Sequence, residues 1–106
     1  MRGGVIMKGK DITSHSRNET DRSPRVISIM SDIGKFSYTV HRHIDYPGEW
    51  LLSSSSLDFE KERLGGVSLE EALVKAKNRI SEILSKRISQ YEEIKKELED
   101  FNNDYK

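Results

Sequence analysis

The stretch SLEEALVKAKNRISEILSKRISQYEEIKKELEDF, residues 68–101, decides the fold of this chain. Ser68 with Glu71 three residues later is a capping box, and no Gly or Pro follows Gly66. The pattern therefore predicts one amphipathic helix from Val67 to about Phe101. At 1.5 Å per residue such a helix is roughly 50 Å long, which is longer than the rest of the chain can cover.

The apolar residues of this helix form one stripe with two parts. Spacings of 3 and 4 are typical of a helix face that packs on a sheet. The residues at these spacings in the first part are Leu69, Leu73, Ala76, Ile80, Ile83 and Leu84. Because ordinary strands span about 30 Å, or about 20 helical residues, we expect the helix to outrun the sheet.

The second part of the stripe has no evident partner within the chain. Its spacings are close to a coiled-coil seam with charged flanks. The residues are Ile88, Tyr91, Ile94, Leu98 and Phe101, and Tyr105 is one step further. We expect these residues to hold two copies together as a homodimer or to bind another, unidentified protein. The alternative is that the N-terminal tail or a kink in the helix covers the stripe.

Three stretches before the helix predict the strands of an antiparallel meander. Residues 25–32 (RVISIMSD) are rich in β-branched side chains, and Gly34 marks a turn. Residues 36–46 alternate between apolar and polar side chains, with Ile44 on the apolar face, until Pro47-Gly48 marks a second turn. Residues 50–57 (WLLSSSSL) form the third strand. Because its serines add little packing, we expect it to fray or to lie at a sheet edge.

The predicted fold is α+β: a three-stranded antiparallel β-meander followed by one long C-terminal amphipathic helix, β-β-β-α. Residues 25–106 form this single domain, in which 58–66 is a charged loop and 88–106 extends the helix beyond the sheet. Residues 1–24 are polar and poor in large apolar groups, so they predict a flexible tail with a short strand at 5–7. Either Met1 or Met7 can be the native start.

Composition limits the class of protein. The chain has 106 residues, of which 34% are hydrophobic and 34% charged, so its core is small and dimerisation would help to stabilise it. It has no Cys, which excludes disulfides and thiolate metal sites and suits a reducing compartment. The apolar run near the N-terminus is too short for a signal peptide or a spanning helix. We expect a cytoplasmic protein without a membrane partner.

One cluster of residues suggests a metal site. His41, His43 and Asp45 would share one face of a strand, where alternate residues point the same way and can meet one metal ion. A fourth ligand is missing unless His15 joins from the tail, and a solvated polar face explains the same residues. No nucleophile elbow and no phosphate-binding Gly loop occurs. We therefore expect no enzyme, no metal and no cofactor.

A nucleic acid is the alternative partner. Lys35, His41, Arg42 and His43 lie on or beside the outward strand face, and a small sheet can enter a major groove. The tail adds cations that could contact phosphates: Arg2, Lys8, Lys10, Arg17, Arg22 and Arg25. Residues 1–48 hold eight Lys/Arg and five Asp/Glu, whereas residues 49–106 hold ten and thirteen. This mild asymmetry neither requires nor excludes a nucleic acid.

The step from a Trp-containing strand through Gly65-Gly66 into SLEEALVKAKNRI resembles two known arrangements. One is the strand-to-helix segment of HicB-type antitoxins, in which such a helix follows a small sheet. The other is the arm-binding N-terminal domain of tyrosine integrases, also three strands and a helix. The chain lacks the acidic, Gly-rich first hairpin of the former and the basic strand runs of the latter. The resemblance therefore implies a phage or mobile-element origin but no functional residues.

These observations predict a small non-enzymatic protein-binding or regulatory module, inhibitor-like and homodimeric through its C-terminal helix. The alternative is a DNA- or RNA-binding protein that uses the exposed sheet face together with the basic tail.

Overall fold

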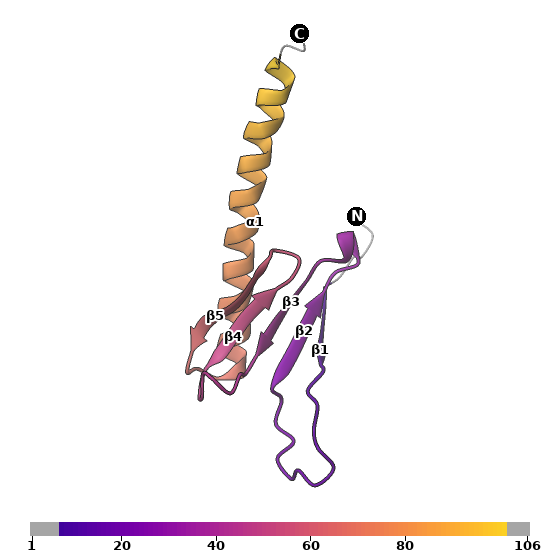
Figure 1. Ribbon diagram of the computed structural model, residues 1–106, viewed down its shortest axis with the longest axis vertical. Coiled ribbons are helices and arrows are strands. Elements are labelled where there is room, and N and C mark those ends of the chain that lie inside the picture. The colour runs from indigo at the N-terminus through magenta and orange to yellow at the C-terminus, as the bar shows by residue number, and fades with distance from the viewer. Residues whose placement is uncertain (1–6, 102–106) are drawn as a thin grey trace. The chain divides into compact units, whose positions relative to one another are not determined.

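The computed structural model describes residues 7–101, which form one antiparallel sheet and one long helix (Figure 1). The helix is α1 (Leu69–Asp100), and a short 3₁₀ turn, η1 (Ile33–Lys35), joins the second strand to the third. The sheet is a meander in which each strand pairs with the next in chain order. Its strands are β1 (Lys8–Asp11), β2 (Val26–Met30), β3 (Ser37–His41), β4 (Trp50–Ser54) and β5 (Phe59–Gly65).

The α+β class and the long C-terminal helix are confirmed, but the prediction of three strands is wrong because the sheet has five. The first additional strand, β1, lies within the predicted tail. All of its residues are exposed, and its backbone pairs with β2 from Lys8 opposite Met30 to Asp11 opposite Ile27. Backbone pairing with β2 holds β1, and the side chains of β1 carry no apolar pattern. The predicted strand at 5–7 falls largely, and Tyr105 entirely, outside the described residues.

The second additional strand, β5, was predicted as a charged loop. It reads FEKERLG, and of its seven residues only Leu64 is buried. Its pairing with β4 contains register shifts, and Lys61 has a φ of +59°. Such a bulge adds an unpaired residue and breaks the two-residue alternation by which a strand is recognised. Leu52 opposite Glu62 shows the result, since an apolar core residue pairs with a charged one.

The serine-rich strand lies inside the sheet, so the expectation that it lies at an edge is wrong; it is also shorter than predicted, because it ends at Ser54 and residues 55–57 form a turn. β4 pairs with β3 on one side and with β5 on the other. Leu51 and Leu52 point to opposite faces, and both are completely buried. Ser54 is 2% exposed, and its hydroxyl donates to the Ser37 carbonyl over 2.7 Å. A hydrogen-bonded serine can therefore occupy the most buried strand.

β3 is shorter than the alternation predicted, because the chain turns after His41. The Tyr46 amide donates to the His43 carbonyl over 3.0 Å. Gly48 has a φ of +78°, a conformation that glycine adopts without strain, and it closes the predicted turn before Trp50. Ile44 lies in this connection and is 90% exposed, so its prediction on the buried strand face is wrong.

The connection between β1 and β2 is organised by hydrogen bonds. The Thr13 hydroxyl accepts the backbone amides of Arg25 and Val26 over 2.7 and 3.0 Å. The Arg25 guanidinium pairs with Glu19 and also donates to the Ser14 carbonyl. These bonds tie the start of the connection to its end, within the stretch predicted as a tail.

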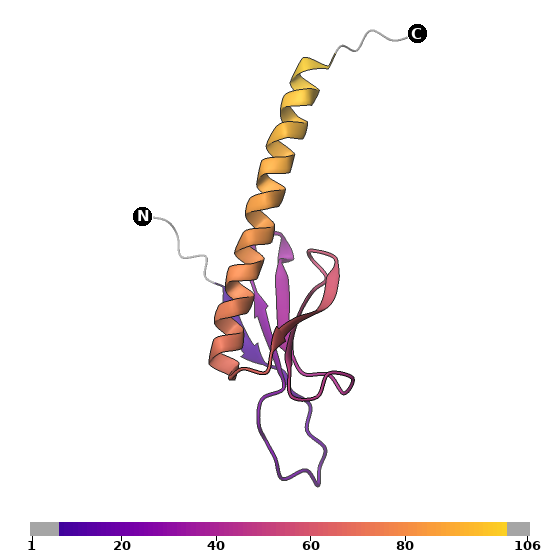
Figure 2. The ribbon, with the colours of Figure 1, turned by 90° about the vertical axis from the view of Figure 1, so that its left-hand side faces the viewer.

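α1 begins as its sequence predicts. The Ser68 hydroxyl accepts the Glu71 amide over 3.1 Å, and Glu70 and Glu71 supply negative charge at the positive end of the helix dipole. Ala72 and Ala76 are completely buried, and the first turns of α1 run along one face of the sheet (Figure 2). Ala72 was missing from the predicted contact residues, and its small side chain allows close packing.

Two compact units divide the chain within α1, one from Met1 to Ala76 and the other from Lys77 to Lys106. The first holds the sheet and most of the core. The buried apolar residues of the described chain are Tyr38, Val40, Trp50, Leu51, Leu52, Leu57, Leu64, Ala72, Ala76 and Ile80.

Candidate protein-binding face of the helix

An exposed apolar stripe follows Ile80 along α1, and we refer to it as the distal stripe. Its six members are between 36% and 69% exposed, although Ile80 itself is 4% exposed. They are Leu84, Ile88, Tyr91, Ile94, Leu98 and Phe101. The sequence pattern placed Leu84 among the residues that pack on the sheet, but Leu84 is exposed. Because it lies four residues before Ile88, it is the first member of the distal stripe. Apolar residues at this density on one helix face usually mark an interface.

The distal stripe occupies one side of α1 only. At 3.6 residues per turn, spacings of 3 and 4 keep its members within one broad face. The opposite side is polar and exposed, as Ser89, Glu92 and Lys96 show. A helix with both faces polar would need no partner, whereas this one displays apolar side chains that a partner can cover.

The second unit also carries opposite charges at its two ends. Residues 77–87 hold four Lys/Arg and one Glu, whereas residues 92–100 hold five Asp/Glu and two Lys. We call these the basic segment and the acidic segment. The last turn of α1 contains no basic residue, so the acidic segment lies at the negative end of the helix dipole. Acidic residues there are unfavourable for an isolated helix.

His41, which the nucleic-acid alternative uses and which belongs to the cluster considered for a metal, is bound within the sheet through both ring nitrogens. Nδ1 lies 3.1 Å from the Arg42 carbonyl oxygen and Nε2 lies 2.7 Å from Ser53 Oγ. Because a carbonyl only accepts, Nδ1 donates to it, while Nε2 shares a hydrogen bond with the hydroxyl. Ser53 Oγ in turn accepts the Lys61 amide over 2.9 Å. His41 therefore links β3 to β4 and β5.

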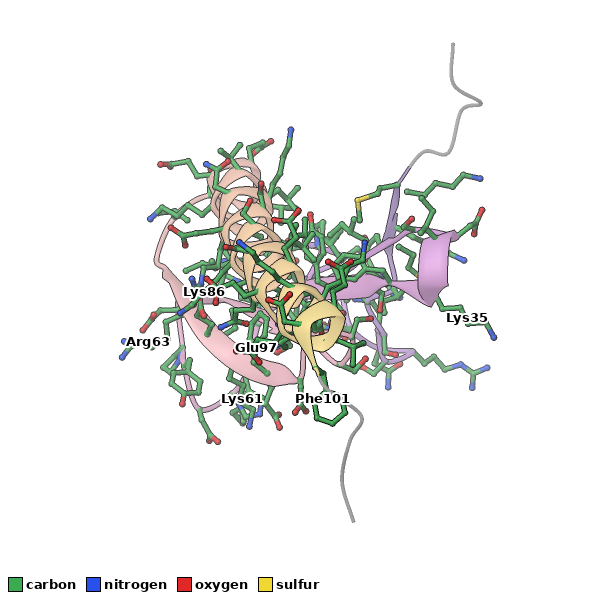
Figure 3. The ribbon with its side chains drawn as sticks, turned by 90° about the horizontal axis from the view of Figure 1, so that it is seen from above. Lys35, Lys61, Arg63, Lys86, Glu97 and Phe101 are labelled. Atoms are coloured by element: carbon green, nitrogen blue, oxygen red, sulfur yellow. The ribbon has the colours of Figure 1, made fainter. Side chains whose placement is uncertain are left out.

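The other predicted cations do not form one patch with His41. The Arg42 guanidinium lies over the Trp50 ring, with 4.1 Å between Cζ and the ring centroid, a cation–π contact. Lys35 lies in η1 at the opposite end of β3, about 17 Å of strand away. In Figure 3, Lys35 projects from one side of the sheet, while Lys61 and Arg63 project from the other. Arg63 is paired with Glu49.

The three residues considered for a metal site are separated by the turn after β3. His43 and Asp45 lie beyond the end of the strand, so they do not share a strand face with His41. Asp45 Oδ2 is 3.7 Å from His43 Nδ1, and the Asp45 amide donates to the same nitrogen over 3.1 Å. Within residues 7–101, no three His, Asp or Glu side chains are placed to hold a metal ion.

A hollow of about 500 Å³ lies beside the strand face predicted to contact nucleic acid. Hydroxyl and acidic side chains line much of it, and no Lys or Arg contributes. Its lining residues are Ser37, Tyr38, Thr39, Ser53, Ser55, Asp58, Phe59 and Glu60. Two carboxylates beside Ser37 and Thr39 repel phosphate, so this part of the sheet favours a nucleic acid less than the sequence pattern indicates.

Comparison with protein families, with curated proteins and with solved structures finds no match to this chain. In the part of the chain that the structure describes, no helix is long and apolar enough to cross a membrane.

Proposed function

We propose that this protein is a non-enzymatic, protein-binding regulatory module that forms a homodimer through the distal stripe. The observation that carries the proposal is the exposure of Ile88, Tyr91, Ile94, Leu98 and Phe101 at coiled-coil spacing. Burial of such side chains is the main favourable contribution to protein association. A second copy is a suitable partner because it offers an identical stripe with charged flanks.

The alternative, binding of DNA or RNA through the sheet and the basic tail, has less support. Arg42 is stacked on Trp50, His41 is bonded within the sheet, and Lys35 lies at the other end of β3. Specific nucleic-acid interfaces bring cations together along the path of the phosphates. We therefore place this alternative second.

Sedimentation velocity of the wild-type chain tests the proposal directly. Across about 1 to 100 µM, the mass should rise from the 12.2 kDa of one chain toward twice that value, because dimerisation follows mass action. A chain that stays monomeric across the whole range contradicts self-association.

A retardation assay with duplex DNA and RNA at low salt tests the alternative. Binding should fall steeply as salt rises and should disappear when Lys35, His41, Arg42 and His43 are replaced together. A monomeric wild type that shows this behaviour would favour the alternative over the proposed function.

A further inference from the structure

The charge distribution of α1 distinguishes the two ways in which helices can pair. In a parallel pair, the basic segments of both copies lie side by side, and so do the acidic segments. In an antiparallel pair, the C-terminal end of each basic segment lies beside the acidic segment of the other copy. Lys86 and Arg87 then lie beside the end of an acidic segment whose net charge is −3, whereas a parallel pair sets them beside the same cations of the second copy, so the antiparallel arrangement is electrostatically favoured.

The helix dipole leads to the same result. The acidic segment ends at Asp100, where α1 ends and its negative dipole end lies, and no basic residue in the last turn compensates it. A parallel pair would place two such ends together. An antiparallel pair brings Lys and Arg side chains of the second copy to each acidic end.

We propose that the homodimer is antiparallel, with Leu84 of one copy level with Phe101 of the other. This inference rests on the proposed function, because it specifies how the distal stripe meets its second copy. In this register Tyr91 of each copy meets Ile94 of the other, and all six stripe residues are covered. Arg87 comes level with Leu98, where its aliphatic stem can cover the leucine while its guanidinium reaches the acidic segment.

Like charges disfavour the register one heptad further toward the C-terminal ends. Moving the two helices by one heptad toward their C-terminal ends places Lys95 beside Lys95 of the second copy and Glu97 beside Glu97. In the proposed register, Lys95 instead lies beside Ile88, and Glu97 lies beside the Gln90 amide. No pair of equal charges then flanks the seam.

The flank of the helix adds an attractive pair. Lys86 and Glu97 are eleven residues, or about three turns, apart, and both project from the same flank of α1 (Figure 3). An antiparallel two-fold arrangement sets equal flanks side by side. Lys86 of each copy then comes level with Glu97 and Asp100 of the other copy.

Cysteine cross-linking tests the orientation, because the natural chain contains no Cys. The variants are Leu84→Cys, Phe101→Cys and, as a control on the polar side, Ser89→Cys, each oxidised with glutathione disulfide. In the proposed dimer, equal positions 84 are about 25 Å apart, far beyond the 7 Å that a disulfide can bridge. Each variant alone should stay uncross-linked, whereas an equal mixture of the first two should cross-link up to about half of its chains.

The outcomes separate the orientation from the proposed function. Cross-linking of Leu84→Cys or Phe101→Cys alone, above the Ser89→Cys control, overturns the antiparallel orientation and leaves self-association intact. Absence of cross-linking in the mixture, when light scattering shows dimers of both reduced variants, overturns the register. A monomeric wild type overturns the proposed function itself.

A pair of charge reversals provides a second readout. Lys86→Glu places like charges beside Glu97 and Asp100 of the second copy, so the dimer Kd should rise about tenfold. Lys96→Glu makes the same charge change on the outward side and should leave Kd within about twofold. Tighter dimerisation of Lys86→Glu would indicate parallel basic segments and would contradict the inference.

Discussion

Leu98→Asp is the substitution that most directly tests the role of the distal stripe. In one chain Leu98 is 69% exposed, so the folded monomer loses little packing when the leucine is replaced. In a dimer the same side chain is covered by the second copy. We therefore expect the variant to dissociate while its sheet unit stays folded.

The magnitude follows from the exposed fraction. Complete burial of a leucine side chain contributes about 1.5–3 kcal/mol, and a partner can bury up to 69% of Leu98, or about 1–2 kcal/mol per chain. A symmetric dimer contains the residue twice, so the loss is about 2–4 kcal/mol before the desolvation of aspartate is added. Since 1.4 kcal/mol is a factor of ten, the dimer Kd should rise about 30- to 700-fold.

Sedimentation velocity or light scattering across a concentration series measures this change. Ser89→Asp is the matched control, because it adds the same single negative charge nine residues, or about two and a half turns, away on the opposite side of α1. The control should retain the wild-type Kd. Equal Kd values for wild type, Leu98→Asp and Ser89→Asp would refute the assignment of the interface to the distal stripe.

The remaining predictions concern the stability of the fold, measured by denaturant unfolding at one protein concentration. Ser68→Ala removes the cap that accepts the Glu71 amide and should lower the free energy of unfolding by about 1 kcal/mol; an unchanged value would show that the cap is dispensable. Leu52→Ala empties a completely buried position and should cost about 2–5 kcal/mol, with less than 1 kcal/mol contradicting its place in the core. Hydrogen bonds from the Arg25 guanidinium and then the Ser16 amide lower the pKa of Glu19 from 4.5 to about 2. The ionised Glu19 therefore stabilises the fold fully above pH 4.5, and this contribution is lost as the pH falls through about 2. Glu19→Gln should flatten that part of the acid titration, and an identical slope in both proteins would contradict the pairing.

The sequence predicts local features of this chain well. The start of α1 at a Ser-x-x-Glu box and its continuation to Asp100 depend on residues three and four apart. The turn at Pro47-Gly48 depends likewise on neighbouring residues. Each of these features forms through contacts that the chain order already specifies.

β1 and β5 show why the rest could not be predicted. β1 is an edge strand with four exposed residues, and it exists because the backbone of β2 is available for pairing. β5 has a bulge and four consecutive charged residues, from Glu60 to Arg63. Neither strand buries alternate side chains, so the sequence of neither strand shows the apolar–polar alternation by which strands are recognised.

The candidate interface, in contrast to β1 and β5, could be predicted from the sequence. Its residues share one helix face, and helix periodicity is visible in the sequence. The surroundings of His41 could not be predicted from the sequence. The turn after β3 and the Ser53 hydroxyl determine where the His41 ring points and what it binds.

By itself, the sequence determined the long helix, its cap, its continuous apolar stripe and the opposite charges of its two segments, because all of these depend on residues within a few turns of one another. Tertiary structure decided which part of that stripe is covered, since burial ends at Ile80 and exposure begins at Leu84. It also decided that five strands form the sheet and that the serines of β4 lie within it, because pairing between distant segments satisfies backbone and hydroxyl groups regardless of local pattern.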